Sequence, residues 1–542
     1  MKNRYRACWL VLGLGLSNLL YPGAGVAKTL QISPPGDGQV RALVIGIDRY
    51  QDVDPLQGAV ADAQDIASAL KNAGVSDLTV LTDGEATRHN IESAMMGIAA
   101  ATPGDLVFMS IAGHGAQAPE QVKGSEPDGM DEIFLLAGFS RSGRGNAERI
   151  VDNEFNGWLA QLNRKGVDVL FVADVCHGGG MTRQPKFGSE TLRYRFAGTV
   201  QLNRGNDTPL TRAANARVKP RDLPHVTFIA GVDKYKLVPE VTIPGTETTR
   251  GALSYAVARA IDAGRDGPIT RQHLFGFSRQ IALQYSQGQQ SIVAEPQGAD
   301  ARLDQVVFRL KTDGVRTAPE RAIPIRLLVM DGDAAKLNGV APNDAPFRLV
   351  KVGKLSDLSR YIGQFDLFWS ADKGEIYSAA GDLIGSARAA SDIPPIVDLV
   401  SAMTTITKLT AMNYQSIELL PNNSRHRKGD VVSFRASGLA NKHLILFDLF
   451  GDGTVRFLYP RDGSDDPLIA DDSFSLPLRV GPPFGSDYVT AIVSETRLEG
   501  LEQSIRALDG QKSAGKLVDL LIATQQSHPD MRVGTAALFT SP

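Results

Sequence analysis

Alternating strand and helix patterns run along the chain from about residue 40 to about residue 310. Short apolar runs predict strands at 40–47, 78–81, 106–111, 168–175 and 226–230. Apolar residues at a spacing of three to four predict helices at 59–73, 87–101, 152–163 and 252–263. Because these strands are apolar on both faces, the pattern predicts a parallel sheet with helices on both sides.

The pattern changes beyond residue 312, where Pro319 and Pro324 flank a predicted linker. Residues 320–410 mix short strands with a helical pattern near 396–409. Residues from about 416 to 494 alternate short strands with turn signals, and helical character returns at 498–521. We therefore expect an α/β fold in three parts. These are a parallel-sheet domain at 38–311, a small mixed α+β region at 320–410 and a β-rich, sandwich-like domain at 411–542.

The first 27 residues have the pattern of a signal peptide. Lys2, Arg4 and Arg6 precede an apolar run from about residue 9 to residue 20, and small residues follow at 25–27. This predicts cleavage before Lys28 and export to the periplasm or the exterior. A membrane anchor and a core helix of a cytosolic protein are the alternatives. The other segments are too short or too charged to span a membrane, so we expect no span after removal of the signal.

Composition and charge narrow the function classes. Of 542 residues, 43% are hydrophobic and 22% charged, which excludes a disordered or fibrous chain. The formal net charge is −3, from 57 Lys+Arg and 60 Asp+Glu. A general basic surface is therefore absent, and we expect no nucleic-acid partner.

Cysteine is scarce in this chain. Cys8 lies in the predicted signal peptide, which leaves Cys176 as the single thiol of the exported protein. A lone thiol in an oxidising compartment forms an intermolecular disulfide, is inert and buried, or is reactive. Our main hypothesis is the reactive thiol.

Two predicted strands end on residues that suit nucleophilic catalysis. The strand at 106–111 runs into His114-Gly115, and the strand at 168–175 runs into Cys176. If the two strands are neighbours, His114 and Cys176 meet at the same sheet edge. The imidazole then takes the thiol proton or holds the thiolate as an ion pair. The backbone N–H groups of Gly115 and Cys176 are candidates for an oxyanion hole.

Simpler interpretations exist for both residues. A cysteine at a strand end is often a small hydrophobic residue, and a histidine between glycines is often a turn residue. His177 is adjacent to Cys176, but neighbouring strand-end residues point to opposite sides, so we prefer His114 as the base. A zinc site is disfavoured because the ligand spacing is missing.

Seven pieces of sequence occur in the order found in one known family, and the region that they span, residues 40–310, covers about half of the chain. They are RALVIGIDRY (41–50), LQGAVADAQDIASAL (56–70), VFMSIAGHG (107–115), EPDGMDEIFL (126–135), VDNEFNGWLAQL (151–162), VLFVADVCHGGG (169–180) and GALSYAVARAI (251–261). On these pieces, residues 40–310 resemble the caspase-like peptidase domain, in its bacterial metacaspase and orthocaspase branch.

The resemblance implies a catalytic dyad of His114 and Cys176, with Asp62 and Asp174 as acids of the primary specificity pocket. It also implies cleavage after Arg or Lys. A carboxylate on the pocket floor pairs with a guanidinium, which gives this preference a physical basis. The alternatives are a surface charge on a helix for Asp62 and an ordinary strand-end acid for Asp174.

The resemblance requires no organic cofactor. Some metacaspases need calcium, and Asp128, Asp131 and Asp152 lie in the corresponding acidic stretches. Asn153 stands where an acid is often present, which argues against a calcium requirement. Ala112 stands where the family commonly has Ser, so the pocket lacks one hydroxyl.

Residues 411–497 resemble an uncharacterised β domain that often accompanies bacterial caspase-like domains. The matching pieces are KGDVVSFRAS (428–437), HLILFDLFGDGTVRFLYP (443–460) and VGPPFGSDYVTAIVS (480–494). Asp452-Gly453 predicts a hairpin turn rather than a calcium loop with Asp448.

Residues 182–221 form a polar stretch without an apolar period. The stretch carries seven arginines and two lysines against two acids. An enzyme with an acidic pocket is expected to cut such a stretch in its own chain, after one or more of Arg193, Arg195, Arg204, Arg212 and Arg217. The alternative is a solvated basic loop or one that contacts an anionic partner.

The sequence thus predicts an exported cysteine endopeptidase that cleaves protein or peptide substrates after Arg or Lys. One rival is a non-catalytic caspase homologue that acts as a binding scaffold. A second rival is a legumain- or gingipain-like peptidase with the same dyad and a different pocket. The sequence predicts no oligomeric state.

Overall fold

The computed structural model describes most of the chain from residue 30 onward. The described residues are 30–120, 124, 126, 128–176, 186–187, 190–191, 193–203, 222–232, 237–263, 266–286, 288, 290–312, 324–361, 363–379, 381–421, 425–461 and 465–542. The predicted signal peptide, His177 and much of the stretch 182–221 lie outside them.

A six-stranded sheet forms the centre of the N-terminal half, in the order β14-β12-β8-β4-β2-β3. Its strands are β2 (Val40–Gly46), β3 (Asp77–Thr82), β4 (Leu106–Ala112), β8 (Asp168–Asp174), β12 (Val226–Ala230) and β14 (Val293–Glu295). Five of these strands are parallel, and only β14 at the edge is antiparallel. The predicted parallel sheet is confirmed, and β4 and β8 are direct neighbours in it.

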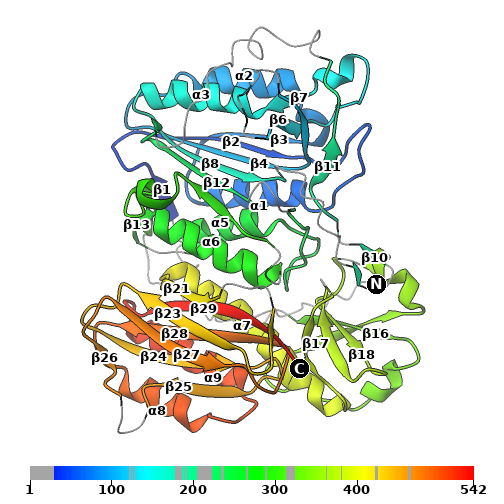
Figure 1. Ribbon diagram of the computed structural model, residues 1–542, viewed down its shortest axis with the longest axis vertical. Coiled ribbons are helices and arrows are strands. Elements are labelled where there is room, and N and C mark those ends of the chain that lie inside the picture. Colours follow the sequence, from blue (N-terminus) through cyan, green and yellow to red (C-terminus); the bar gives the residue numbers. More distant parts are fainter. Residues whose placement is uncertain are drawn as a thin grey trace, which may run out of the picture.

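Helices cover both faces of this sheet, as predicted (Figure 1). One face carries α1 (Ala59–Asn72), α5 (Ala252–Asp262) and α6 (Arg271–Tyr285), and the other carries α2 (Arg88–Ile98) and α3 (Asp152–Arg164). Val44 and Phe108 enter the core beneath α1, α5 and α6, whereas their neighbours Leu43 and Val107 enter the core beneath α2 and α3. Both faces of each strand are therefore buried, which explains the continuous apolar runs.

A second, four-stranded sheet lies beside the ends of β4 and β8, in the order β11-β5-β6-β7. Its strands are β5 (Gly115–Pro119), β6 (Met130–Leu135), β7 (Arg149–Val151) and β11 (Phe196–Thr199). The strand β5 starts directly after His114 and pairs in parallel with β11. Part of the polar stretch 182–221 is thus ordered against the main domain.

Two small sheets complete this half. They are β1 (Leu30–Ser33) with β15 (Val306–Thr312) and β13 (Gly267–Thr270), and β9 (Lys186–Phe187) with β10 (Glu190–Thr191).

The mixed region contains a five-stranded sheet in the order β17-β16-β18-β19-β20, and a long helix follows it. These elements are β16 (Ile325–Met330), β17 (Phe347–Val352), β18 (Leu367–Ser370), β19 (Glu375–Ser378), β20 (Leu383–Ser386) and α7 (Ile393–Met412). The helix α7 is buried along most of its length, which explains the apolar run near 396–412. In the part of the chain described above, no helix is long and apolar enough to cross a bilayer.

The C-terminal domain packs two sheets face to face. The smaller sheet has β21 (Ile417–Leu420), β23 (Val431–Ser437) and β27 (Ser473–Arg479). The larger has β22 (His426–Arg427), β24 (Lys442–Leu449), β25 (Val455–Tyr459), β26 (Leu468–Ile469), β28 (Ser486–Ser494) and β29 (Arg532–Ser541). Phe434 of the smaller sheet and Val489 of the larger share the core between the sheets, as in a sandwich.

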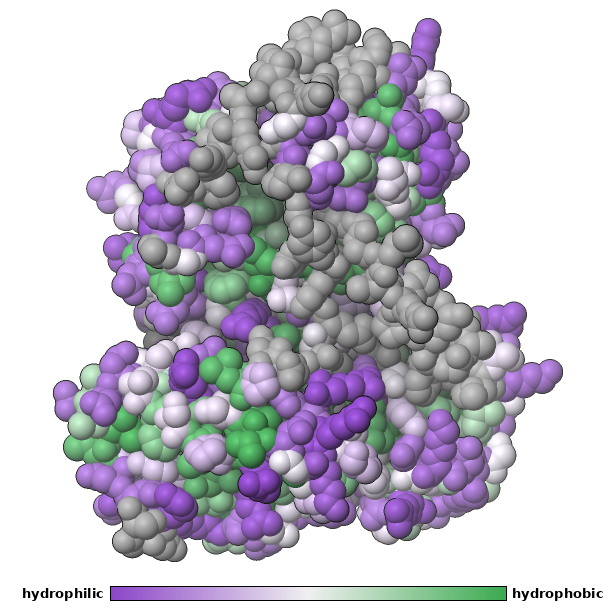
Figure 2. Space-filling model, in the orientation of Figure 1, coloured by the Kyte–Doolittle hydropathy of each residue, from purple (hydrophilic) through white to green (hydrophobic). Residues whose placement is uncertain are grey.

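The outer face of the larger C-terminal sheet is covered by α7, α8 (Glu499–Ala507) and α9 (Ala514–Ser527). The same core includes residues of the mixed region such as Leu327 and Trp369. The two C-terminal parts therefore share one hydrophobic core. Figure 2 shows hydrophilic residues over much of the described surface of both halves, with apolar patches mainly on the lower half.

The two halves of the molecule meet closely at α6. A Cβ on Gly276 would lie 2.3 Å from the hydroxyl oxygen of Tyr414. Ala411, near the end of α7, belongs to the core beneath α1, α5 and α6.

Two buried carboxyl groups in the C-terminal domain make its stability depend on pH. Burial raises the pKa of Asp448 to about 7, and Oδ1 of this residue has no hydrogen-bond partner among the described residues. Burial and the nearby Asp448 raise the pKa of Asp487 well above its usual range. A carboxyl group whose pKa is raised in the folded state loses its proton more readily in the unfolded state. The free energy of unfolding therefore falls as pH rises from about 4 to about 7.

We therefore expect Asp448→Asn to raise the Tm by roughly 3–10 °C at pH 8 and to change it little at pH 4. Asn removes the buried charge and keeps an acceptor oxygen. Thermal unfolding at both pH values measures this, with the exposed Asp471→Asn as the control. An equal effect at both pH values would contradict the interpretation.

Candidate active site

The predicted dyad residues leave the central sheet at the same edge. His114 follows β4 and Cys176 follows β8, and the last residues of these strands, Ala112 and Asp174, are paired. The two loops touch: a Cβ on Gly115 would lie 1.7 Å from the carbonyl oxygen of Cys176. Only glycine fits at position 115, because any side chain would push the Cys176 backbone away.

His114 is held so that one ring nitrogen stays available. Its Nε2 lies 2.9 Å from the carbonyl oxygen of Asp54, which makes Nε2 the protonated nitrogen. Its Nδ1 is buried and has no hydrogen-bond partner among the described residues. The Tyr50 hydroxyl accepts a hydrogen bond from the His114 backbone N–H at 2.7 Å, and the two rings pack edge to face. Burial lowers the pKa of His114 to about 4, so the imidazole is neutral at pH 7.

Cys176 is almost fully enclosed, with 1% of its surface exposed. Its Sγ accepts a hydrogen bond from the backbone N–H of Val238 at 2.9 Å. Burial raises the pKa of the thiol to about 12. Of the two protonation states left open by the sequence, the structure therefore favours a neutral thiol beside a neutral imidazole.

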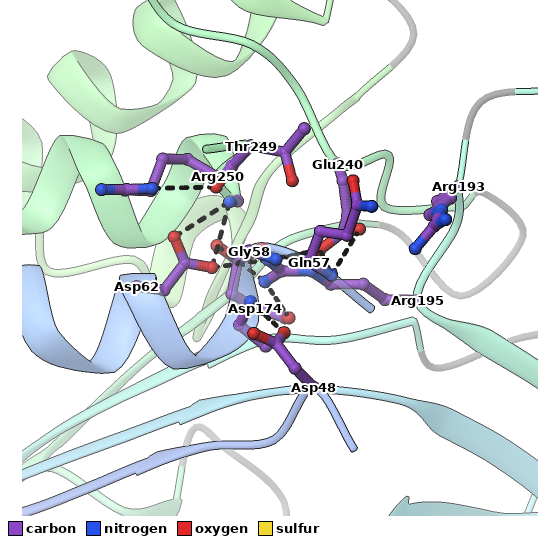
Figure 3. A network of polar contacts seen from close by, with 12 residues as sticks. Asp48, Gln57, Gly58, Asp62, Asp174, Arg193, Arg195, Glu240, Thr249 and Arg250 are labelled. Carbon is purple, nitrogen blue, oxygen red and sulfur yellow. Dashed lines mark hydrogen bonds and ion pairs between the residues drawn. The ribbon is translucent and has the colours of Figure 1, made fainter. Parts of the chain in front are cut away.

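The guanidinium of Arg195 lies among three buried acids, Asp62, Asp174 and Glu240 (Figure 3). Arg195 Nη2 lies 2.5 Å from Oδ2 of Asp62 and 3.8 Å from Oε1 of Glu240. Its Nη1 donates to the carbonyl oxygen of Asp174 at 3.0 Å and lies 3.6 Å from Oδ2 of the same residue. The side chains of all four residues are at most 1% exposed. Asp62 is thus a buried pocket acid and not a surface charge on its helix.

Backbone N–H groups orient the three carboxylates toward the cation. Asp62 accepts from the N–H of Gly251, Asp174 accepts from the N–H of Ser254, and Glu240 accepts from the N–H groups of Gln57 and Gly58. These contacts measure 3.0, 2.8, 3.1 and 2.7 Å in that order. Gly251 and Ser254 lie at the start of α5, where the helix dipole favours negative charge.

The charges of this pocket depend on one another. Burial raises the pKa of Asp62 well above its usual range, and the Arg195 cation opposes this effect. Burial raises the pKa of Glu240 in the same way. Burial alone would lower the pKa of Arg195, but Asp62, Asp174 and Glu240 outweigh it and the net pKa is raised. Arg195 therefore stays charged, and its charge opposes the rise that burial causes in the pKa of Asp62 and Glu240.

The backbone of Arg195 is also held in the site. Its carbonyl oxygen accepts from the N–H of Gly115 at 2.9 Å and from the N–H of Cys176 at 3.4 Å. These N–H groups are the two predicted donors of the oxyanion hole. The N–H of Arg195 donates to the carbonyl oxygen of Val238 at 3.0 Å. One arginine thus occupies both the acidic pocket and the predicted oxyanion site.

Sequence reasoning selected His114, Cys176, Gly115, Asp62 and Asp174, and the structure places all five at this edge of the sheet. It did not select Glu240, and it named Arg195 only as one of five candidate sites of self-cleavage. Glu240 follows the parallel strand β12, so a search for acids beyond every strand end would have included it. No local pattern marks Arg195 among the seven arginines of its stretch.

The acids that the resemblance linked to calcium lie near α3, on the opposite face of the sheet from α1 and α5. Burial raises the pKa of Asp152 to about 7, and the charges of Glu126 and Asp131 add to this rise. Among the described residues, no group of three or more His, Cys, Asp or Glu side chains could hold a metal ion.

Comparison with known proteins places the chain in a family. The family model of the metacaspase peptidase C14 domain matches residues 40–185. A metacaspase-1A of Aspergillus clavatus is 32% identical over 299 residues, which cover 48% of this chain and 67% of that protein. The chain belongs to the metacaspase family. The metacaspases of peptidase family C14 are cysteine-type endopeptidases, in keeping with the residues found at the strand ends.

Other metacaspases match over the same half of the chain. A metacaspase-1A of Neosartorya fischeri is 27% identical over 301 residues, covering 48% of this chain and 66% of that protein. A metacaspase-1 of Coccidioides immitis is 27% identical, covering 48% and 62%. The matched segment thus spans only about two thirds of the length of these relatives.

Two solved structures align with the metacaspase-like half. One is a protein of Geobacter sulfurreducens, with 22% identity and a TM-score of 0.34, which covers 49% of this chain and 97% of that chain. The other is titled as the structure of pro-sf-caspase-1, with 13% identity and a TM-score of 0.27, which covers 45% and 81%.

The position of Glu240 leads to a test of the pocket. We expect Glu240→Gln to raise KM for a peptide with Arg before the scissile bond by about tenfold, because one of three carboxylates around the cation is lost. We expect kcat to change less, since the reacting carbonyl is held elsewhere. Steady-state kinetics measure this, and the exposed Glu247→Gln is the matched control. Unchanged KM in a folded Glu240→Gln protein would remove Glu240 from the pocket.

Proposed function

We propose that this metacaspase is an exported cysteine endopeptidase that cleaves peptide bonds after Arg or Lys. The observation that carries the proposal is the double placement of Arg195. Its guanidinium lies among Asp62, Asp174 and Glu240, while its carbonyl oxygen accepts from the N–H groups of Gly115 and Cys176. A substrate arginine bound in the same way presents its carbonyl carbon to the nucleophile.

The proposed mechanism is acyl transfer through the dyad. Cys176 Sγ attacks the carbonyl carbon while Nδ1 of His114 takes the thiol proton. The N–H groups of Gly115 and Cys176 stabilise the negative charge on the carbonyl oxygen. His114 then gives its proton to the leaving amine, and water hydrolyses the thioester. The hydrogen bond from His114 Nε2 to Asp54 holds the ring with Nδ1 available.

The pocket supports arginine over lysine. The two terminal nitrogens of the guanidinium contact different groups, Nη2 with Asp62 and Nη1 with Asp174. A lysine ammonium is a single point charge and reaches one side of the pocket at a time. A substrate aspartate would add a further negative charge to three buried carboxylates, which is strongly unfavourable. We therefore propose the order Arg, then Lys, with no cleavage after Asp.

Two parts of the proposal rest on the sequence. Export rests on the pattern of a signal peptide at 1–27. Self-processing within 182–221 rests on the basic composition of that stretch and on the acidic pocket, which suits its arginines.

Covalent labelling of Cys176 distinguishes the peptidase from the scaffold alternative, because a scaffold would have no reactive thiol. We expect an Arg-based peptide electrophile to label Cys176 at least about tenfold faster than an Asp-based one, because only the Arg form neutralises the pocket acids. Mass spectrometry of the intact protein and of its peptides measures this. Cys176→Ala is the control and should remain unlabelled.

The labelling is carried out on the wild type and on Arg195→Gln, in which the pocket lacks its internal cation. Labelling of neither protein would favour the scaffold. Equal labelling by both electrophiles would favour a peptidase with a different pocket, such as a legumain-like enzyme.

A further inference from the structure

We infer that the peptide bond between Arg195 and Phe196 is a cleavage site of the protein's own active site, bound there as an internal substrate. This inference rests on the proposed function, since it needs a reactive Cys176. It goes further by naming one bond among the several arginines of the stretch 182–221 and by assigning the residues on each side to subsites.

The residues before the bond are bound as an added β-strand. The N–H of Arg195 donates to the carbonyl oxygen of Val238 at 3.0 Å, and the N–H of Glu240 donates to the carbonyl oxygen of Arg193 at 3.0 Å. An antiparallel bridge joins Tyr194 to Pro239 between these contacts. Strand addition of this kind is a common way for proteins to bind extended peptides. It fixes which carbonyl of the segment reaches the nucleophile.

Arg195, the residue before the bond, contacts both the acidic pocket and the proposed reaction centre. The guanidinium of Arg195 is fully buried among carboxylates. The carbonyl oxygen of Arg195 receives the N–H of Cys176, the same residue that carries the nucleophilic Sγ. The carbonyl carbon bonded to Phe196 is therefore the one that faces the thiol. Arg193, by contrast, is exposed and its guanidinium donates to the carbonyl oxygen of Pro55, outside the pocket.

The residues after the bond are held as well. Phe196 begins β11, which pairs in parallel with β5, and Phe196 is in register with Gly115. The N–H of Val200 donates to the carbonyl oxygen of Gln117 at 2.8 Å, which extends this attachment. The Phe196 side chain packs on the apolar cluster of Cys176, Val232 and Val238. Both flanks of the bond are thus fixed, and an aromatic residue fills the position after it.

The reaction balances with groups that are present and water. Sγ of Cys176 forms a thioester with the carbonyl carbon of Arg195 as the bond to the Phe196 nitrogen breaks. The thiol proton passes through Nδ1 of His114 to that nitrogen, which becomes a new amino terminus. Water then adds to the thioester, giving the Arg195 carboxylate and the free thiol.

Occupancy of the site by the intact segment has a consequence for other substrates. Residues 177–192 tether Arg195 to the nucleophile, so the internal arginine competes at a high effective concentration, of the order of millimolar. The uncut chain is therefore latent toward peptides in solution. A substrate that enters after cleavage replaces Arg195. The internal Arg195–Phe196 bond predicts the sequence of such a substrate, with arginine before the scissile bond and a large apolar residue after it.

The first experiment maps cleavage in the full-length protein. Purified wild type, Cys176→Ala, Arg195→Gln and Arg212→Gln are incubated, and new termini are identified by mass spectrometry. We expect a new amino terminus at Phe196 in the wild type and in Arg212→Gln, whose substituted arginine lies in the same stretch. We expect none in Cys176→Ala or in Arg195→Gln.

The second experiment tests latency with a variant that keeps the pocket arginine. Phe196→Pro should block cleavage, because proline after the bond resists peptidases, and should leave Arg195 in place. We expect both Phe196→Pro and Arg195→Gln to remain uncut. We also expect Arg195→Gln to hydrolyse an Arg peptide at least about tenfold faster than Phe196→Pro, because only in Arg195→Gln is the acidic pocket free of the internal arginine. Thermal unfolding shows whether each variant is folded, because Arg195→Gln leaves three buried carboxylates without their cation.

The outcomes separate the inference from the proposed function. The inference is wrong if the wild type keeps its Arg195–Phe196 bond whole and still hydrolyses Arg peptides as fast as Arg195→Gln does. The proposed peptidase function would stand in that case. A first cut elsewhere, or the same cut in Cys176→Ala, also overturns the inference. Absence of both hydrolysis and Cys176 labelling in the wild type and in every folded variant overturns the proposed function, and the inference with it.

Discussion

The pairing of one buried cation with three buried carboxylates is the constraint on which this site depends. Asp62 belongs to α1, Asp174 to β8 and Glu240 to the segment after β12, so Arg195 ties three separate elements together. Three unpaired carboxylates at this depth would have to take up protons or water. The pocket is therefore stable only when it holds a cation, from its own chain or from a peptide. Folding at this edge of the sheet and the proposed specificity for arginine therefore have the same electrostatic origin.

The central sheet explains why His114 and Cys176 lie at the same edge. Parallel pairing of β4 with β8 brings His114 and Cys176 to one edge, and the absence of a side chain at Gly115 lets the two loops touch. The helix α5 starts at the same edge and offers backbone N–H groups to Asp62 and Asp174. Burial keeps His114 and Cys176 neutral. In the proposed mechanism, the nucleophile is therefore activated by proton transfer within the dyad rather than by a standing charge.

The sequence predicted the parts that depend on local pattern. Apolar runs identified the parallel strands, and the rule that functional groups follow strand ends selected His114, Cys176 and Asp174. The sequence named Arg195 only among five candidate arginines and could not single it out, because Arg195 pairs with Asp62 across 133 positions of the chain. Arg195 directly precedes β11, which has only four residues (FAGT), all of them partly or fully exposed, and therefore gives no apolar run in the sequence. The shared core of the mixed and C-terminal regions was missed for a similar reason, as α7 packs on strands far along the chain.

Val238 shows how much of the site is made by backbone alone. Its carbonyl oxygen receives the N–H of Arg195, and its own N–H reaches Sγ of Cys176. The same residue thus bonds to both Arg195 and Cys176 through its backbone, while its buried side chain packs in the apolar cluster with Cys176. Exchange of valine for another amino acid of similar volume would leave both bonds in place, and only proline would remove the bond to sulfur. A search for a particular type of side chain would therefore miss this position, although its backbone N–H and C=O groups bond to Cys176 and Arg195.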